Sequence, residues 1–236
     1  MSEECAWLHK ELECLPLIQF PFKPDLLPEN GIYFFYEKGE FPGHRGIKAR
    51  IVRIGTHKDG NFRSRIFEHY LVSAAKMRFD NTKPAPKDRS IFRKNLGRAL
   101  LRKRGDRYAD IWEVDFTTSA NRHKYRAQRD ISHEMMIERT ITNILRKTFS
   151  FRFVSVPEEV DRLGNLGLER ALIGTCARCD SCKPSSRWLG LHSPKSKIRD
   201  KGLWLVQHLS APCVTPQQKK MLERYVKQTK KMVRPV

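Results

Sequence analysis

Two stretches rich in β-branched and aromatic residues lie early in the chain. Residues 31–36 read Gly-Ile-Tyr-Phe-Phe-Tyr, a run typical of a strand. Residues 47–55 contain a second such run, in which Val52 and Ile54 alternate with Arg53. The connection over 37–46 is polar and contains glycine. The pattern predicts an antiparallel hairpin with a long loop.

Apolar residues at helical spacing follow this hairpin. A third strand is predicted at 149–156, where Phe149, Phe151 and Phe153 alternate with polar residues, and a short one at 110–116. Residues 1–28 contain four prolines and are expected to be irregular. Helices are predicted at 62–78, 91–104 (capped by Ser90), 131–147, 158–175 and 216–232 (capped by Thr215). The order favours an α+β fold with a small mixed or antiparallel three-stranded sheet flanked by helices.

The charge of the chain narrows the class of partner. There are 46 Lys and Arg against 26 Asp and Glu among 236 residues, a formal net charge of +20. Such an excess attracts polyanions, and nucleic acid is the leading candidate. An anionic membrane surface is second, because the basic residues are spread along the chain rather than gathered on one amphipathic helix. No membrane-spanning apolar run or secretory signal is visible, so a cytoplasmic protein that does not bind membranes is expected.

Five separate signals occur in an order that resembles the GIY-YIG nuclease family. Gly31-Ile32-Tyr33 begins the first strand, and Arg53-Ile54-Gly55 ends the second. Arg65 and His69 are four residues apart on the next predicted helix and share one face. Glu169 lies in a Leu-Glu-x-x-Leu-Ile pattern after the last strand. The resemblance covers about residues 31–190 and implies a metal-dependent DNA endonuclease of a bacterial standalone or restriction type.

The resemblance also implies catalytic roles. Tyr33 would act as the general base or relay a proton from the attacking water, and the first role requires that its phenolate be stabilised near neutral pH. Arg53 and Arg65 would favour the phenolate, and Arg65 would also bind the scissile phosphate. His69 would contact the phosphate or assist proton transfer, and His57 is a second candidate for that role.

The metal site implied by the resemblance consists of one carboxylate. Glu169 would hold a single Mg²⁺ or Mn²⁺, a hard cation suited to oxygen ligands. Water and DNA would supply most of the coordination, so the ion should bind weakly without DNA.

Three departures from the family pattern bear on activity. Arg53 stands where the second motif has tyrosine, and nineteen residues separate it from Tyr33, more than is usual in the family. The asparagine expected after the glutamate corresponds to Ser185 or Ser186. These departures leave open a nucleic-acid-binding module whose cleavage is lost or attenuated, and an RNA-directed protein is a third hypothesis.

The predicted domain organisation has one core with extensions. Residues 1–28 form an N-terminal segment, 29–212 the nuclease domain and 213–236 a basic C-terminal helix. A helical insertion is expected at about 79–148, and its basic residues Arg93, Lys94, Arg98 and Arg102 are expected to contact double-stranded DNA. Because one active site cuts one strand, cleavage of both strands would require a homodimer or sequential nicking.

A cluster of cysteines follows the predicted glutamate helix. Cys176, Cys179 and Cys182 are evenly spaced, and Cys213, His192 or His208 could complete a set of four ligands. Structural zinc takes four nitrogen or sulfur ligands. A zinc site, free thiols and an iron–sulfur cluster all remain open.

Overall fold

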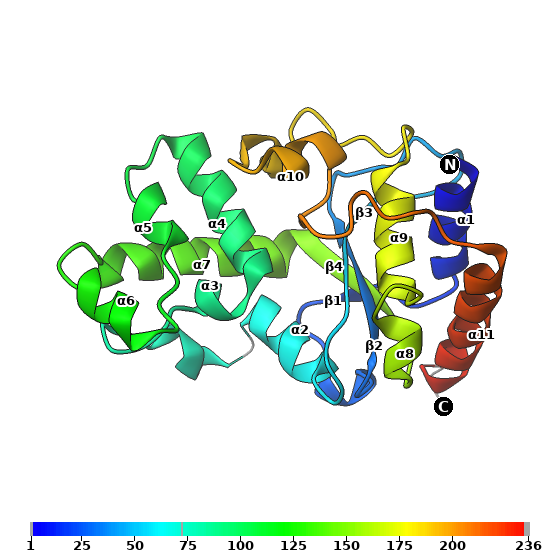
Figure 1. The fold of residues 1–236 in the computed structure, drawn as a ribbon, viewed down its shortest axis with the longest axis horizontal. Coiled ribbons are helices and arrows are strands. Elements are labelled where there is room, and N and C mark those ends of the chain that lie inside the picture. Colours follow the sequence, from blue (N-terminus) through cyan, green and yellow to red (C-terminus); the bar gives the residue numbers. More distant parts are fainter. Residues whose placement is uncertain (1, 72, 234–236) are drawn as a thin grey trace.

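A four-stranded antiparallel sheet runs through the centre of the protein in the computed structural model (Figure 1), which describes residues 2–71 and 73–233. The strand order is β1-β4-β2-β3. The strands are β1 (Ile18–Gln19), β2 (Gly31–Glu37), β3 (Ile51–Gly55) and β4 (Phe149–Ser155). The α+β class is confirmed, with β1 as a fourth strand that pairs with β4.

The central strand β2 is buried on both faces, which explains its continuous run of apolar residues. Ile32 and Phe34 face one hydrophobic cluster, and Tyr33 and Phe35 face the other. In the pairing of β2 with β3, Tyr33 lies opposite Gly55. The pleat therefore places the tyrosine beside the end of the second motif.

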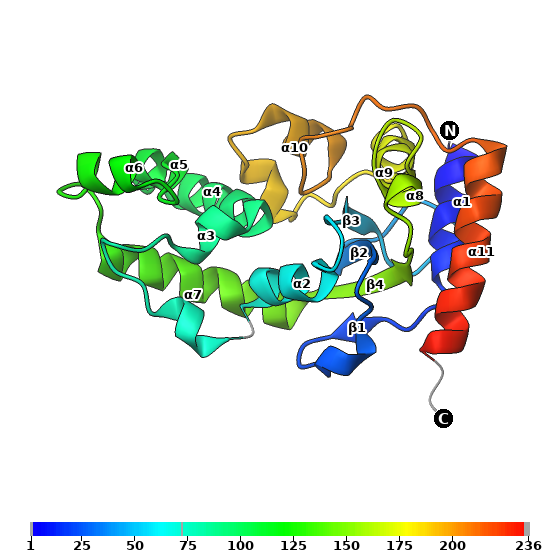
Figure 2. The ribbon, with the colours of Figure 1, turned by 60° about the horizontal axis from the view of Figure 1, so that its bottom comes forward.

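One face of the sheet is covered by α1 (Ser2–Leu12), α9 (Leu168–Ala177) and α11 (Pro216–Met232). Helices α1 and α11 lie side by side at one end of the molecule, close to both termini (Figures 1 and 2). Thr215 caps α11 with its hydroxyl, as predicted, and Gln218 completes a reciprocal capping box.

The opposite face carries α2 (Phe62–Tyr70), α4 (Ile91–Arg104) and α7 (Ile131–Thr148). Their outer ends, with the short helices between them, extend away from the sheet (Figure 2). The remaining α-helices are α3 (Pro86–Arg89), α5 (Ala109–Glu113), α6 (Ser119–Lys124), α8 (Glu159–Arg162) and α10 (Ser196–Lys201). Three 3₁₀ turns complete the described elements: η1 (Pro24–Leu26), η2 (Ala74–Met77) and η3 (Leu189–His192).

Several local predictions are wrong. The strand expected at 110–116 is helix α5, because Trp112 is fully buried against Gly97 of α4 and donates its indole N–H to the Lys94 carbonyl. Residues 2–12, expected to be irregular, form α1, because Cys5, Leu8 and Leu12 give it a buried stripe.

Two predicted helices are shorter than their patterns. The helix expected over 62–78 ends at Tyr70, since Leu71 takes a left-handed conformation with φ of 50°. The helix expected over 158–175 is interrupted at 163–167, which separates α8 from α9. Among the described residues, no helix is long and apolar enough to cross a bilayer.

Candidate active site

A cavity of about 540 Å³ opens where the ends of β2 and β3 meet α2, α9 and the start of α4. It brings together five side chains that the resemblance had given catalytic or metal-binding roles, which are Tyr33, Arg53, Arg65, His69 and Glu169. Its lining residues are Tyr33, Arg53, Ile54, Gly55, Thr56, Arg65, His69, Asp88, Arg89, Ile91, Asn95, Glu169, Ile173, Leu205, Val206, Gln207 and His208. His57 lies beside the cavity, where its ring accepts a hydrogen bond from Arg65.

Tyr33 is linked by hydrogen bonds to the N-terminus of α4. Its hydroxyl lies 3.3 Å from Nε2 of His69, and Nδ1 of His69 lies 2.8 Å from Oγ of Ser90. Burial, reinforced by the charges of Arg53 and Arg65, lowers the pKa of His69 well below its usual value. The imidazole is therefore neutral at physiological pH.

The tautomer of His69 follows from the bonds of Ser90. Ser90 Oγ already accepts the backbone N–H of Arg93, and its own proton needs an acceptor because the residue is fully buried. Among the described residues, His69 Nδ1 is the acceptor within its reach. His69 consequently carries its proton on Nε2 and donates it to the oxygen of Tyr33, an arrangement that stabilises negative charge there.

Arg65 is fixed at the mouth of the cavity. Its Nε donates to Nε2 of His57 at 3.1 Å, and its Nη1 donates to Glu68 at 3.0 Å and to the Arg89 carbonyl at 2.6 Å. The side chain is 34% exposed, so the guanidinium is open to a ligand. Burial and the charges of Arg65 and Arg162 lower the pKa of His57 to about 4, which keeps that ring neutral as an acceptor.

Arg53 is more deeply buried than Arg65. It donates to the Trp204 carbonyl, and its guanidinium lies 4.9 Å from the centre of the Phe92 ring. Only 7% of the residue is exposed, and Nε has no partner among the described residues. The arginine thus contributes a fixed positive charge to the cavity wall.

Glu169 reaches the cavity from the first turn of α9. Its Oε1 accepts the backbone N–H of Thr56 at 3.0 Å, while no described residue bonds its second carboxylate oxygen. Burial raises the pKa of Glu169, although the bond from Thr56 opposes the shift. One carboxylate oxygen is therefore anchored and the other is free to bind a ligand.

Both motif glycines are required by close packing. A Cβ on Gly55 would lie 2.4 Å from the Tyr33 hydroxyl, and a Cβ on Gly31 would lie 2.5 Å from the Val154 carbonyl oxygen. Real Cβ atoms do not approach so closely. Gly55 makes room for the tyrosine, whereas Gly31 makes room for the neighbouring strand.

The family model described as "GIY-YIG domain" matches residues 22–232, most of the chain. The chain belongs to the GIY-YIG domain family. This family consists of nucleases, so its substrate is a nucleic acid. Comparisons with curated proteins and with solved structures gave no match.

One basic residue of this GIY-YIG domain was misassigned from the sequence. Arg93, expected to contact DNA, is fully buried and makes an ion pair with the equally buried Glu138 at 2.5 Å. It also donates to Thr142 and to the His69 carbonyl. That expectation is wrong, because the guanidinium is enclosed by protein groups.

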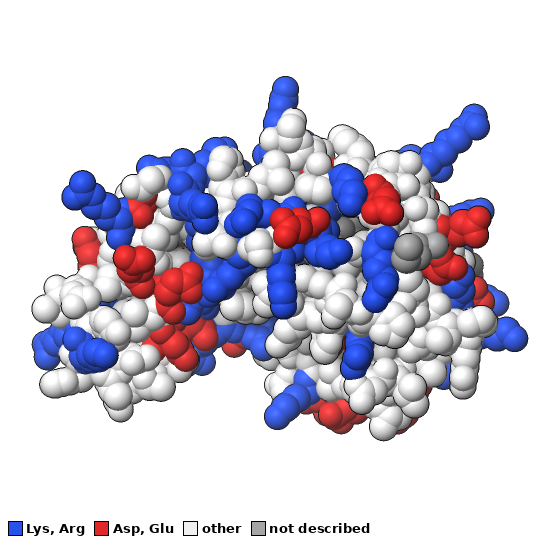
Figure 3. Space-filling view, turned by 45° about the horizontal axis from the view of Figure 1, so that its top comes forward, with Lys and Arg blue, Asp and Glu red and all other residues white. Residues whose placement is uncertain are grey.

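The other basic residues of α4 differ in exposure. Lys94 donates to the Glu113 carbonyl, and Arg98 pairs with the Glu113 carboxylate while remaining 10% exposed. Arg102 is exposed. Lys and Arg side chains are spread over much of the face in Figure 3, with Asp and Glu side chains among them. Arg102 is thus the best placed of the four to meet a polyanion.

Two polar residues of the GIY-YIG site were given no role in it from the sequence: Asn95, which lines the cavity, and Ser90, which contacts His69. Ser90 was identified only as a helix cap. Asn95 is 1% exposed and lines the cavity, and its Nδ2 has no partner among the described residues. Helical spacing could have placed Asn95 one turn after Ile91, but not beside Tyr33. Ser185, one of the two positions expected to replace the family asparagine, bonds Glu40 instead, and neither it nor Ser186 lines the cavity.

The cysteines considered for zinc lie elsewhere in the GIY-YIG domain. Cys176, Cys179 and Cys182 are buried and line no part of this cavity. Cys213 is partly exposed and belongs to no group of potential metal ligands found among the described residues. The thiol of Cys182 instead lies within hydrogen-bonding distance of the thiol of Cys5, which comes from the distant N-terminus.

Proposed function

We propose that this GIY-YIG nuclease is a metal-dependent endonuclease that hydrolyses phosphodiester bonds of double-stranded DNA. The observation that carries the proposal is the convergence of Tyr33, Arg65 and Glu169 on one cavity, with Tyr33 bonded to neutral His69. Phosphodiester hydrolysis needs a base for water, positive charge at the phosphate and assistance to the leaving oxygen. This cavity contains groups suited to the first two tasks.

Tyr33 is proposed as the base that takes the proton of the attacking water. The bond from His69 Nε2 stabilises the phenolate oxygen, and Ser90 holds the imidazole in the tautomer that makes this bond. His69 is then a positioning residue that acts through Tyr33.

Arg65 is proposed to bind the scissile phosphate, because it has a partly exposed guanidinium at the cavity. Arg53 adds a fixed positive charge that favours the dianionic transition state. Their different exposure supports a direct contact with the phosphate for Arg65 and stabilisation at longer range for Arg53.

The free oxygen of Glu169 fits a hard divalent cation such as Mg²⁺ or Mn²⁺. GIY-YIG nucleases generally use a divalent metal. Such an ion, when bound, supplies positive charge beside the phosphate. A single carboxylate leaves the other coordination positions to water and DNA.

The test is cleavage of supercoiled and linear duplex DNA with and without Mg²⁺ or Mn²⁺. Glu169→Gln and Tyr33→Phe should each abolish nicking while retaining DNA affinity. Glu158→Gln, which changes an exposed carboxylate near the start of α8, is the matched control and should cleave normally. Retained cleavage in Glu169→Gln would exclude the assigned metal ligand.

The same assay separates the finer possibilities. Discrete fragments from linear DNA would show restriction-type recognition, and a dependence of double-strand cuts on protein concentration would show a homodimer. RNA of matched sequence tests the substrate class.

Because Arg53 replaces the motif tyrosine and is held by Trp204, a binding module without cleavage is the second candidate. Salt-sensitive DNA binding without cleavage in any metal would select it.

A further inference from the structure

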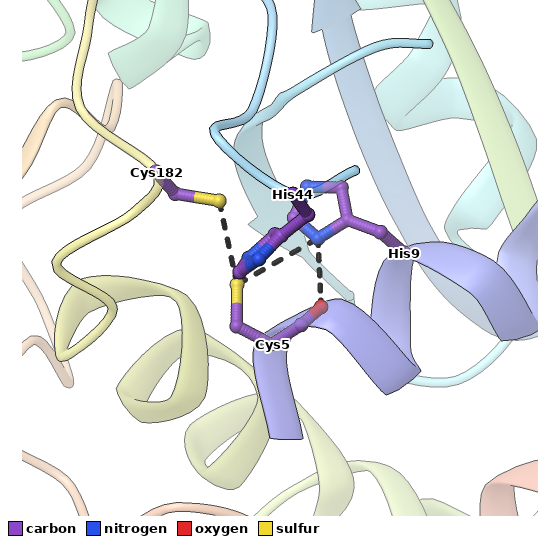
Figure 4. Close-up of side chains that lie close together, drawn as sticks. All are labelled: Cys5, His9, His44 and Cys182. Atoms are coloured by element: carbon purple, nitrogen blue, oxygen red, sulfur yellow. Dashed lines mark hydrogen bonds between the residues drawn. The ribbon is translucent and has the colours of Figure 1, made fainter. Parts of the chain in front are cut away.

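Cysteine and histidine side chains from three distant parts of the chain meet beside α1 (Figure 4). Cys5 and His9 come from α1, His44 from the connection between β2 and β3, and Cys182 from the segment after α9. Their ligand atoms all lie within 4.8 Å of one another. None of these residues lines the candidate active-site cavity.

The spacing of these atoms suits a tetrahedral zinc ion. Zn–S bonds of about 2.3 Å and Zn–N bonds of about 2.0 to 2.1 Å place ligand atoms about 3.3 to 3.8 Å apart. Sγ of Cys5 lies 3.5 Å from Sγ of Cys182, and Sγ of Cys179 lies 3.4 Å from Nε2 of His44. These two pairs of side chains are already at separations that coordination requires.

His9 is close to the cluster, but its ring nitrogens are both in use. Nε2 accepts the backbone N–H of Ile51 at 3.1 Å, so the ring proton is on Nδ1. Nδ1 lies 2.8 Å from the Cys5 carbonyl oxygen and donates to it. Binding a metal would cost His9 one of these buried bonds. The bond from Ile51 holds α1 against β3.

Cys179 offers a better fourth ligand. It belongs to a Cys-x2-Cys pair with Cys182, the spacing common in zinc sites. It also contacts His44. We propose that Cys5, His44, Cys179 and Cys182 bind one structural Zn²⁺ ion.

The surrounding backbone holds the ligand segments together. Gly43, next to His44, donates its N–H at 2.7 Å to the carbonyl of Ser181, which lies between the two cysteines. A Cβ on Gly43 would lie 2.4 Å from that oxygen, so glycine permits the approach. A bound ion would join α1, the β2–β3 connection and the segment following α9, the helix that carries Glu169. The site would stabilise the fold, independently of cleavage chemistry.

The first test is the metal content of the reduced, purified full-length protein produced with zinc in the medium. We expect about one zinc ion per chain in the wild type, and less than a tenth of that in Cys179→Ser and Cys182→Ser. Cys14→Ser, an exposed thiol after α1, and Cys213→Ser are matched controls that should retain the ion. His9→Gln should also retain it. Zinc lost in His9→Gln but kept in Cys179→Ser would overturn the ligand set.

The second test uses the wild-type chain and therefore does not depend on the folding of variants. Replacement of zinc by Co²⁺ should produce the visible bands of a tetrahedral ion and near-ultraviolet thiolate-to-cobalt charge transfer. Removal of the ion with a strong chelator should lower the unfolding temperature and expose buried thiols to a thiol reagent. Protein that contains no zinc and yields no such cobalt spectrum would overturn the proposal, as would the absorption of an iron–sulfur cluster.

Discussion

Ser90 Oγ lies 2.8 Å from Nδ1 of His69. Since His69 also bonds Tyr33, the proposed base, Ser90 links the N-terminus of α4 to that base. The same oxygen caps α4 by accepting the N–H of Arg93. One hydroxyl therefore both begins a helix and selects the tautomer in which His69 donates to Tyr33. The segment between α2 and β4 thus takes part directly in the candidate site.

Replacing Ser90 should reduce cleavage more than binding. Ser90→Ala removes the bond that selects the tautomer, worth about 1 to 2 kcal/mol, so we expect cleavage to slow by about tenfold with DNA affinity nearly unchanged. Loss of the cap should also lower the free energy of unfolding by about 1 kcal/mol. Single-turnover cleavage and DNA titration measure the two effects.

Ser90→Thr provides the matched test, because it keeps the hydroxyl and should recover most of the rate. Ser64→Ala removes an exposed hydroxyl on α2 and should change neither quantity. Equal rates for Ser90→Ala and Ser90→Thr would contradict the tautomer argument.

Gly55 and Gly31 should respond differently to alanine. In Gly55→Ala, the new methyl group displaces the Tyr33 ring, and a shift of about 1 Å can cost about 100-fold in rate. In Gly31→Ala, the methyl group meets the backbone of β4, so lower stability is the main effect. Cleavage rates and denaturant unfolding distinguish them. A wild-type rate in Gly55→Ala would argue against Tyr33 as the base.

Ionisation of the buried Glu37 should lower the free energy of unfolding as the pH rises. Its Oε2 accepts the indole N–H groups of Trp188 and Trp204 at 2.9 and 3.0 Å, yet burial raises the pKa of Glu37 to about 7. The folded state therefore binds the proton more tightly than the unfolded chain, whose glutamate has a pKa of about 4.3. The free energy of unfolding should decline between about pH 4.5 and 7, by on the order of 3 to 4 kcal/mol for this group.

Glu37→Gln keeps an acceptor for the indoles but cannot ionise. We expect this variant to lack that decline and to be more stable than the wild type at pH 8. Denaturant unfolding at several pH values measures the difference, with Glu158→Gln as the exposed control. Parallel pH curves for Glu37→Gln and the wild type would disprove the assignment.

Arg93 and Arg102 lie on the same helix but should have separate effects. Arg93→Ala leaves Glu138 buried without its partner and should cost about 3 to 5 kcal/mol of stability. Arg102→Ala should leave stability almost unchanged and weaken DNA binding, lowering the salt dependence by about one counterion. Unfolding curves and DNA titrations at several salt concentrations check both. A destabilised Arg102→Ala with unaltered DNA affinity would count against this division.

Local pattern was sufficient for the elements that carry the motifs. The apolar run of β2, the helical periodicity of α7 and the Thr215-Pro216 start of α11 each predict their element, because burial and capping act over a few residues. The ordered motifs also indicated Tyr33, Arg65 and Glu169. Local pattern failed for α5, whose alternation resembles a strand until Trp112 packs against Gly97.

The partners of those residues depend on tertiary structure. Ser90 meets His69, Trp204 meets Arg53, and Cys5 meets Cys182 across 177 positions. No local periodicity relates such pairs, because their proximity results from the way whole helices pack on the sheet. The family, the charge and the reactive groups followed from the order of the amino acids alone. Packing alone decided which groups are buried, which tautomer His69 adopts and which thiols meet, since these depend on desolvation and on contacts between distant segments.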